Sequence, residues 1–307
     1  IMSTVAVVGS GMMGRGIAAC ICAGGPHTIK MYDSREEAIQ TGVDCALGLV
    51  KFLRDANVPP GASVGTISAA TSLEDAVKDA EFVFEAVFES VEVKQTVFGE
   101  IEALCRPDAI LCTNTSSLSV TEIASKLKTP ERMIAAHFIG PAHLVPLVEL
   151  CPGNASGPDA APKVHAFLTS CGKKPIFMKK EIDGFIAARL QAALYRECMH
   201  LVQSGVADVD AIDSAVVNGF GRRLNQIGPF TVADCAGVDL VQGTHARFFP
   251  QLGSYQRDEL ADELVASGRL GLKSKTGHYN WTDEMAAEVT GRRDQELLRR
   301  LQADFAK

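Results

Sequence analysis

The sequence lacks the long apolar segments and basic clusters that are typical of membrane and nucleic-acid-binding proteins. No apolar run reaches the roughly 18 residues that a helix needs to cross a bilayer. The N-terminus has no basic region followed by an apolar core and a cleavage site, so we expect no signal peptide. Acidic residues outnumber basic ones, with 37 Asp and Glu against 30 Lys and Arg. We therefore expect neither a membrane nor a nucleic acid among the partners of this chain.

Paired cysteines are also missing. The nine cysteines are scattered, and no two of them have the C-x-x-C spacing or the spacing of a zinc site. Several lie inside apolar runs, as small buried hydrophobic residues do. This usage predicts reduced thiols, a cytoplasmic location and no bound metal.

Residues 5–33 carry the strongest local pattern. The apolar run Val5–Val8 leads into Gly9-Ser10-Gly11-Met12-Met13-Gly14, and a helical pattern then leads to a second apolar run that ends in Asp33. The three glycines let the chain turn tightly, let a pyrophosphate approach the backbone, and let the helix pack closely on its strand. The pyrophosphate then lies at the positive end of the helix. This stretch predicts a dinucleotide-binding site.

The identity of the dinucleotide is predicted from Asp33. It follows Gly14 by 19 residues, where a carboxylate can accept hydrogen bonds from both hydroxyls of an adenine ribose. Because its charge would repel a 2′-phosphate, the predicted cofactor is NAD. Lys30 and Arg35 lie nearby and keep NADP open as the less favoured alternative.

The remaining pattern predicts an α/β fold with two domains. The 307 residues are 47% hydrophobic, which is enough for a sizeable core. Short apolar runs alternate with helical patterns at first, which is typical of a doubly wound parallel sheet. From Gly184 onward only helical periodicity is found. We predict a Rossmann-type NAD-binding domain over 1–183 and an all-helical domain over 184–307. Predicted strands are 66–68, 81–87, 109–114, 133–139, 144–150 and 175–179, and predicted helices include 35–56, 72–77, 90–104, 119–127, 185–204, 208–218, 229–246, 256–268 and 282–304.

A histidine and a glutamate flank a predicted chain reversal. His137 ends one predicted strand, Gly140-Pro141 is a turn, and Glu149 lies on the next predicted strand. Such a reversal can bring the imidazole and the carboxylate side by side, and a carboxylate at one ring nitrogen raises the basicity of the other. That base can take the proton of a substrate hydroxyl while hydride leaves for NAD+. A structural histidine near a strand end is an equally open interpretation.

Further polar residues follow predicted strands. Ser116 and Ser117 lie at the edge where open α/β sheets bind ligands, so a hydroxyl there can hold a substrate oxygen. Capping of the following helix by Ser117 or Ser119 is the alternative. Glu89 and Lys94 either face a cofactor or substrate, or are solvated.

Almost end to end, the chain resembles the 3-hydroxyacyl-CoA dehydrogenase family. The resemblance rests on the glycine stretch, Glu85–Glu89, Asn114–Leu118, His137 with Glu149, Asp183–Ile186, Ile227–Phe230 and Lys273–Tyr279. It implies a catalytic dyad of His137 and Glu149, and a contact between Ser116 and the substrate oxygen. It also implies a homodimer formed through the helical domain, and an active site between the domains. The full set of predicted cofactor-binding residues is Gly9, Gly11, Met12, Met13, Gly14, Asp33, Glu89, Lys94 and Asn114.

Two positions depart from the family pattern. The family usually has Asn three residues after the catalytic histidine, where this chain has Gly140, and Asn before Arg in the first helix of the second domain, where it has Ala188. One oriented hydrogen bond can carry on the order of a hundredfold in rate. The chain is therefore expected to be either a dehydrogenase with a different substrate, or a weakly active or silent NAD-binding protein of the crystallin type.

The substrate class is predicted from short segments. Val145–Leu150 resembles the branch of L-gulonate 3-dehydrogenase and lambda-crystallin more than the acyl-CoA branch. The region 45–67 is shorter and less rich in lysine than the CoA-binding stretch of acyl-CoA enzymes. Arg222-Arg223 is a candidate for holding a free carboxylate, with a solvated helix end as the alternative. These segments favour a free 3-hydroxy acid as the small-molecule substrate, and a 3-hydroxyacyl-CoA thioester stays open as the alternative.

Overall fold

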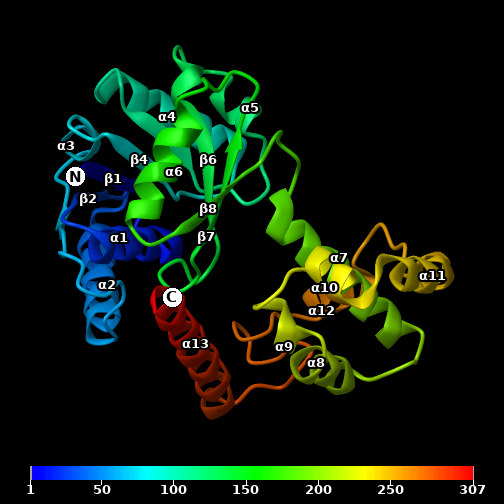
Figure 1. Cartoon of the computed structure of the whole chain (residues 1–307). Helices are drawn as coiled ribbons and strands as arrows, with labels where there is room; N and C mark the ends of the chain where they lie inside the picture. The colour runs from blue at the N-terminus through cyan, green and yellow to red at the C-terminus, as the bar shows by residue number, and fades with distance from the viewer. Residues whose placement is uncertain (1, 307) are drawn as a thin grey trace. The chain divides into compact units, whose positions relative to one another are not determined.

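Eight strands form a single sheet in the order β3-β2-β1-β4-β5-β6-β7-β8 (Figure 1). The structure is a computed structural model that describes residues 2–306. The strands are β1 (Thr4–Val8), β2 (Thr28–Tyr32), β3 (Thr66–Ala69), β4 (Phe82–Glu85), β5 (Ile110–Thr113), β6 (Met133–Phe138), β7 (Leu147–Pro152) and β8 (Lys174–Phe177). Strands β1 to β6 pair in parallel, which confirms the predicted Rossmann-type sheet.

The last two strands change direction relative to the parallel part of the sheet, as the predicted reversal between His137 and Glu149 requires. β7 runs antiparallel to β6, and β8 pairs in parallel with β7. The reason is the short connection over 139–146, since a parallel crossover needs a dozen or more residues. The predicted strand 144–150 also begins too early, because the N–H groups of Leu144 and Val145 donate to the Pro141 carbonyl within this connection.

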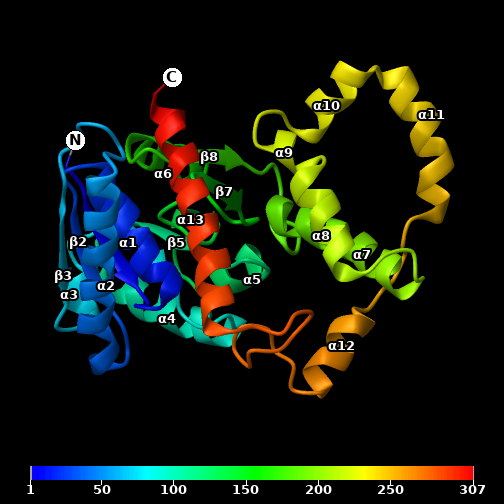
Figure 2. The ribbon, with the colours of Figure 1, turned by 90° about the horizontal axis from the view of Figure 1, so that it is seen from below.

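Helices cover both faces of the sheet (Figure 2). On one face lie α1 (Met12–Gly24), α2 (Glu36–Asp55) and α6 (Ala160–Ser170), and on the other lie α3 (Leu73–Val77), α4 (Val91–Leu104) and α5 (Val120–Ala124). Alternate residues of β1 supply the two cores, because side chains along a strand point to opposite faces. Val5 and Val7 pack in the first core, whereas Ala6 and Val8 pack in the second.

Residues Ala187–Val289 form a separate helical unit. Its elements are most of α7 (Phe185–Gln203), α8 (Val209–Asn218), α9 (Gly221–Leu224), α10 (Pro229–Ala236), α11 (Val238–Phe248), α12 (Glu259–Ala266) and the start of α13 (Asp283–Phe305). The predicted helix 229–246 is broken, because Gly237 takes a φ of 95° between α10 and α11. Within residues 2–306, no helix is long and apolar enough to cross a membrane.

The last part of α13 belongs to the unit that contains the sheet. From Thr290 onward the chain groups with that unit, and Leu301 is buried with Leu53 and Leu144. This grouping differs from the predicted division into two consecutive domains at 183 and 184. The spacing of apolar residues predicts that 282–304 is helical, but it does not show against which unit the apolar face of that helix packs.

Candidate active site

The glycine stretch forms the turn between β1 and α1. Gly9 has a φ of 107°, and a Cβ there would overlap the Ala86 carbonyl. A Cβ on Gly14 would overlap the Gly9 carbonyl, so α1 approaches β1 this closely only with glycine at that position. A Cβ on Gly11 would meet no atom within 4 Å. The start of α1 is therefore open to an anion at Gly11, as a pyrophosphate requires.

Asp33 lies beside this turn, at the end of β2. Its Oδ2 accepts a hydrogen bond from the Ser10 N–H at 2.8 Å, and its Oδ1 accepts one from the Arg35 N–H at 3.1 Å. Each carboxylate oxygen keeps a second lone pair for a ribose hydroxyl. Asp33, Gly9 and Gly11 line a cavity of about 540 Å³. The Arg35 guanidinium lies 3.5 Å from Asp33. The carboxylate partly neutralises its positive charge, which weakens any attraction of Arg35 for a 2′-phosphate.

A buried ion cluster joins β4 to α4. Lys94 is 1% exposed, and its ammonium lies 2.7 Å from Glu85 Oε1 and 3.2 Å from Glu89 Oε2. Burial excludes the solvated alternative for Lys94, while its contact with a cofactor stays a prediction. Glu85 is fully buried and also accepts a hydrogen bond from the Thr113 hydroxyl at 2.7 Å. Glu85 was not among the predicted site residues, although a carboxylate inside an apolar strand needs a partner and so points to such a cluster.

Glu89 connects this cluster to the segment after β5. It accepts hydrogen bonds from the Thr115 hydroxyl at 2.5 Å and from the Ser116 N–H at 3.0 Å. Burial alone would raise the pKa of Glu89, but the Thr115 hydroxyl and Lys94 outweigh it and hold the pKa below its usual range. The ionised Glu89 thus fixes the backbone that carries Ser116. Ser119, not Ser117, caps α5, because its side chain accepts the Glu122 N–H.

His137 and Glu149 face each other across β6 and β7. The distance from His137 Nδ1 to Glu149 Oε2 is 2.8 Å, and the two residues are 7% and 0% exposed. Glu149 Oε1 accepts a hydrogen bond from the Ile186 N–H at 3.0 Å. A carboxylate held in this way makes Nδ1 the protonated nitrogen and Nε2 the basic one. Phe185, which takes a φ of 45°, packs with its ring centroid 5.5 Å from that of the imidazole.

One cavity of about 330 Å³ brings together several of the predicted residues. Its lining comprises Met13, Ala86, Val87, Glu89, Asn114, Ser116, His137, Phe138 and Gly140. Asn114 Oδ1 accepts the Phe138 N–H at 2.8 Å, which ties the end of β5 to the residue after His137. A Cβ on Gly140 would have only the Met13 sulfur within 4 Å, at 3.7 Å. The cavity therefore has room at the position where the family usually carries an Asn side chain.

Four other predicted residues lie on α1, α7 and α9. Met12 is 75% exposed at the start of α1, where its backbone N–H rather than its side chain is placed for an anion. Arg222 and Arg223 are exposed in the last turn of α9, and Ala188 lies on α7. These last three residues belong to the helical unit.

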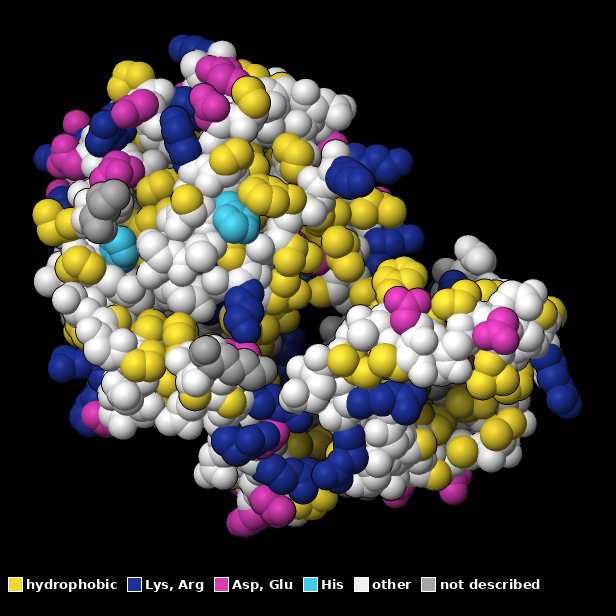
Figure 3. Space-filling view, viewed as in Figure 1, with side chains coloured by type: hydrophobic (Ala, Val, Ile, Leu, Met, Phe, Trp, Pro, Cys, Tyr) yellow, Lys and Arg dark blue, Asp and Glu magenta, His cyan; other side chains and the backbone are white. Residues whose placement is uncertain are grey.

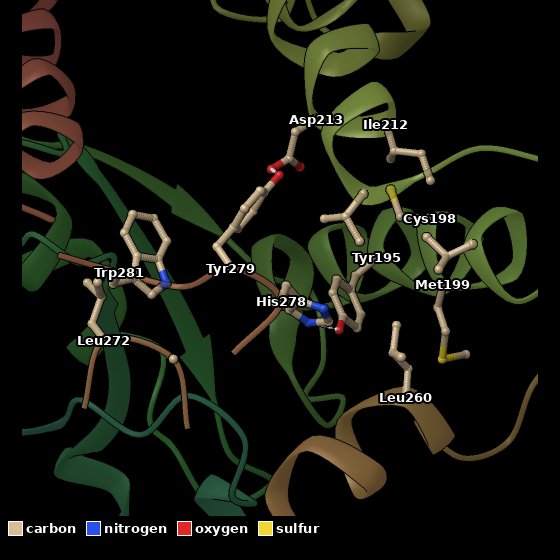
Figure 4. Close-up of a pocket in the computed structure, with 13 residues that line it drawn as sticks. Tyr195, Cys198, Met199, Ile212, Asp213, Leu260, Leu272, His278, Tyr279 and Trp281 are labelled. Atoms are coloured by element: carbon tan, nitrogen blue, oxygen red, sulfur yellow. Dashed lines mark hydrogen bonds between the residues drawn. The ribbon is translucent and has the colours of Figure 1, made fainter. Parts of the chain in front are cut away.

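A second cavity lies within the helical unit (Figure 4). It has a volume of about 340 Å³ and a largely apolar lining that includes Met199, Ile212, Leu260 and Leu272. Its polar side chains are paired with one another. Tyr195 Oη lies 2.9 Å from His278 Nε2, and the Tyr279 hydroxyl donates to Asp213 at 2.7 Å. Burial and the Asp213 carboxylate raise the pKa of Tyr279.

Comparison with known families matches both parts of the chain. Residues 4–182 match the NAD binding domain of 3-hydroxyacyl-CoA dehydrogenase, and residues 184–281 match the C-terminal domain of the same family.

Some relatives are named for free acids and others for CoA thioesters. The chain is 30% identical to 5-formyl-3-hydroxy-2-methylpyridine 4-carboxylate 5-dehydrogenase of Mesorhizobium japonicum, over 96% of each chain. It is 31% identical to L-carnitine dehydrogenase of Oceanobacillus iheyensis, over 97% of each. It is also 31% identical to 3-hydroxybutyryl-CoA dehydrogenase of Clostridioides difficile, over 90% of this chain and 99% of the relative. A crystal structure of the pyridine carboxylic acid 5-dehydrogenase, described as an NAD+-dependent dismutase, matches with a TM-score of 0.93 and 29% identity over 99% of both chains.

Proposed function

The chain belongs to the 3-hydroxyacyl-CoA dehydrogenase family, and on that premise we propose that it oxidises the 3-hydroxyl of a free 3-hydroxy acid to the 3-keto product. The observation that carries the proposal is the 2.8 Å contact between His137 Nδ1 and the buried Glu149 carboxylate. NAD, the cofactor of the family, accepts the hydride when it is bound.

In this proposal His137 is the general base. Its Nε2 takes the proton of the substrate hydroxyl while hydride leaves the carbon that bears it, so the C–O single bond becomes a carbonyl. The imidazolium that results keeps its Nδ1 proton in the hydrogen bond to Glu149. Glu149 stays in place because the Ile186 N–H holds its other oxygen.

Ser116 is the proposed contact for the reacting oxygen. It lines the same cavity as His137, and Glu89 holds its N–H at 3.0 Å. In turn, Lys94 lies between Glu89 and Glu85 at 3.2 and 2.7 Å, so the support for Ser116 is an ionic cluster with buried members. Buried charges that are paired and hydrogen-bonded hold a fixed geometry.

The preference for a free acid rests on three observations. Val145–Leu150 resembles the gulonate branch, and the relatives named above include enzymes of free carboxylic acids. Gly140 leaves the cavity open where the family usually carries Asn, which favours a different substrate. Gly140 also favours a second candidate, a silent NAD-binding protein.

We also propose a homodimer formed through the helical unit. Among the described residues of Ala187–Val289, only Met199 and Ile212 are buried hydrophobic side chains. Helices α10 and α11 bury no residue, with Phe230 87% exposed and Leu240 65% exposed. Apolar side chains accordingly reach the surface of this unit in Figure 3. A domain of this size needs a larger core, and a second copy is the most common way to cover such a surface.

NADH formation by the purified protein tests the function. The panel consists of gulonate, 3-hydroxybutyrate and carnitine beside 3-hydroxybutyryl-CoA, each with NAD+. We expect turnover of at least one free acid at a higher kcat/KM than the thioester. Efficient turnover of the thioester alone would refute the substrate class, and silence across the panel with intact NAD binding would support the silent protein.

A His137→Ala variant tests the base. We expect its turnover to fall on the order of 10²- to 10⁴-fold while its affinity for NAD+ is unchanged. Turnover that survives this substitution would remove His137 from the reaction.

A further inference from the structure

Lys173 is a buried cation that the proposed reaction does not use. It is 6% exposed and lies between α6 and β8. At the end of α6, Gly172 takes a φ of 81°, and the N–H groups of Gly172 and Lys173 donate to the carbonyls of Thr169 and Leu168, each at 3.0 Å. This is a Schellman ending, which fixes the backbone position of the residue that follows the glycine.

The ammonium of Lys173 binds the loop that connects the two members of the dyad. It donates a hydrogen bond to the Ala142 carbonyl and another, at 3.0 Å, to the Val145 carbonyl. It also lies 5.9 Å from the ring centroid of Phe138, the residue after His137. All three contacts therefore fall within the segment that begins at His137 and ends at Glu149.

Two side chains of that loop are buried. Ala142 and Leu144 are 2% and 1% exposed, and the N–H groups of Leu144 and Val145 both donate to the Pro141 carbonyl at 3.0 Å. Ala142 also packs against α1, because a Cβ on Gly16 would lie 3.1 Å from the Ala142 Cβ. The loop thus lies against the helix that begins at the dinucleotide turn.

A charged ammonium group that is buried against neutral carbonyls is an unusual arrangement. A buried ammonium loses its hydration, and neutral carbonyls restore less of that free energy than a carboxylate does. An apolar side chain would fill the same space after α6 without this cost. What the ammonium supplies is a hydrogen-bond donor for two loop carbonyls that face the interior.

We infer that Lys173 is a positioning residue for the dyad. By holding the 139–146 loop at two carbonyls, it keeps His137 and Glu149 at their contact distance and keeps Gly140 at the edge of the cavity. The inference rests on the proposed function, because its consequence for turnover requires His137 to be the base.

The test is a Lys173→Met variant, which keeps the aliphatic length and removes the ammonium. We expect kcat to fall roughly tenfold to a hundredfold, since a base displaced by about 1 Å loses rate on this scale. The affinity for NAD+ is expected to change less than about threefold, because no residue of the loop lines the cavity beside Asp33. A fall in kcat with unchanged NAD+ affinity separates positioning from a general loss of structure.

Lys174→Met is the matched control. The Lys174 ammonium is largely exposed and lies 2.8 Å from Asp304, so this variant removes a neighbouring charge without touching the loop. It is expected to behave like the unaltered chain. A kcat for Lys173→Met that equals that of the control would overturn the inference.

Hydrogen exchange separates this inference from the proposed function. If His137→Ala retains turnover, the function fails, but faster exchange of the Leu144 and Val145 amides in Lys173→Met still supports the anchoring. Unchanged exchange overturns it. Lys173→Gln keeps a hydrogen-bond donor for one carbonyl, so its amide exchange rate and its kcat are expected to lie between those of Lys173→Met and the unaltered chain. It replaces Lys173→Met if that variant does not fold.

In the unaltered chain the Leu144 and Val145 amides are expected to exchange only through the opening that exposes β6 and β7, and an independent opening of the loop would contradict the inference.

Discussion

At the scale of single residues, Glu149 is held more firmly than a carboxylate that only accepts from an imidazole. It is 0% exposed and accepts hydrogen bonds from His137 Nδ1 and from the Ile186 N–H. Because the carboxylate faces Nδ1, it favours the tautomer of His137 that carries its proton on Nδ1.

Replacement of Glu149 by Gln tests this selection. The amide keeps the size of the side chain but offers an NH₂ group to Nδ1, which favours the wrong tautomer. We expect kcat to fall on the order of 10²- to 10⁴-fold with little change in NAD+ affinity. Steady-state kinetics are compared with those of Glu131→Gln, an exposed control, and equal rates in the two variants would argue against a dyad.

Glu89 makes a pH-dependent contribution to stability. Burial raises the pKa of Glu89, but the Thr115 hydroxyl and Lys94 together lower it by more than burial raises it. The pKa of Glu89 in the folded protein therefore lies below its ordinary value. A carboxyl whose pKa is depressed on folding stabilises the protein above its unfolded pKa and loses that effect as the pH falls through the folded value. We expect the difference in unfolding free energy between the unaltered chain and Glu89→Gln to be constant near pH 7 and to shrink below about pH 4.5. Urea unfolding at several pH values measures it, and a difference that grows in acid would contradict the assignment.

At the scale of elements, two glycines of the turn before α1 have different expected roles, Gly11 in binding NAD+ and Gly14 in stability. Gly11→Ala adds a methyl group into open space, so we expect the unfolding free energy to change by less than about 1 kcal/mol. The same methyl group stands where a pyrophosphate approaches, and NAD+ affinity is expected to fall roughly tenfold or more. Gly14→Ala is the matched comparison, because its methyl group meets the Gly9 carbonyl and is expected to cost about 1–3 kcal/mol of stability. Denaturant unfolding and NAD+ titration distinguish the two variants, and a Gly11→Ala variant that binds NAD+ normally would refute the site.

Elements defined by local chemistry could be predicted from the sequence. The strands β1 and β4 are apolar runs, α3 begins at the cap Ser72, and the reversal at Gly140-Pro141 brings His137 opposite Glu149 as expected. The Lys94 cluster and the role of Ile186 could not be predicted, because they depend on which residues meet between distant segments. Likewise, no pattern in the sequence says that α6 ends by presenting Lys173 to a loop that precedes it.

At the scale of the whole molecule, the exposed apolar residues of α10 and α11 govern the proposed assembly. A Phe230→Asp, Leu240→Asp double variant places two charges on this surface, where burial by a second copy would be costly. We expect the unaltered chain to sediment as a dimer and the double variant as a monomer in analytical ultracentrifugation. Leu47→Asp, which changes an exposed leucine of α2, is the control and is expected to remain dimeric. A monomeric unaltered chain would refute the proposal.

The position of Leu301 has a consequence for how the protein is made. Leu301 completes a small apolar cluster with Ala23, Leu53, Val58 and Leu144, and Leu144 belongs to the loop that joins β6 to β7. A ribosome adds Leu301 only after it has made all of Ala187–Val289. Throughout that interval the nascent NAD-binding unit exposes this hydrophobic cluster, which makes it a substrate for chaperones. The synthesis of Leu301, rather than completion of the sheet, is thus the step that finishes the dinucleotide unit.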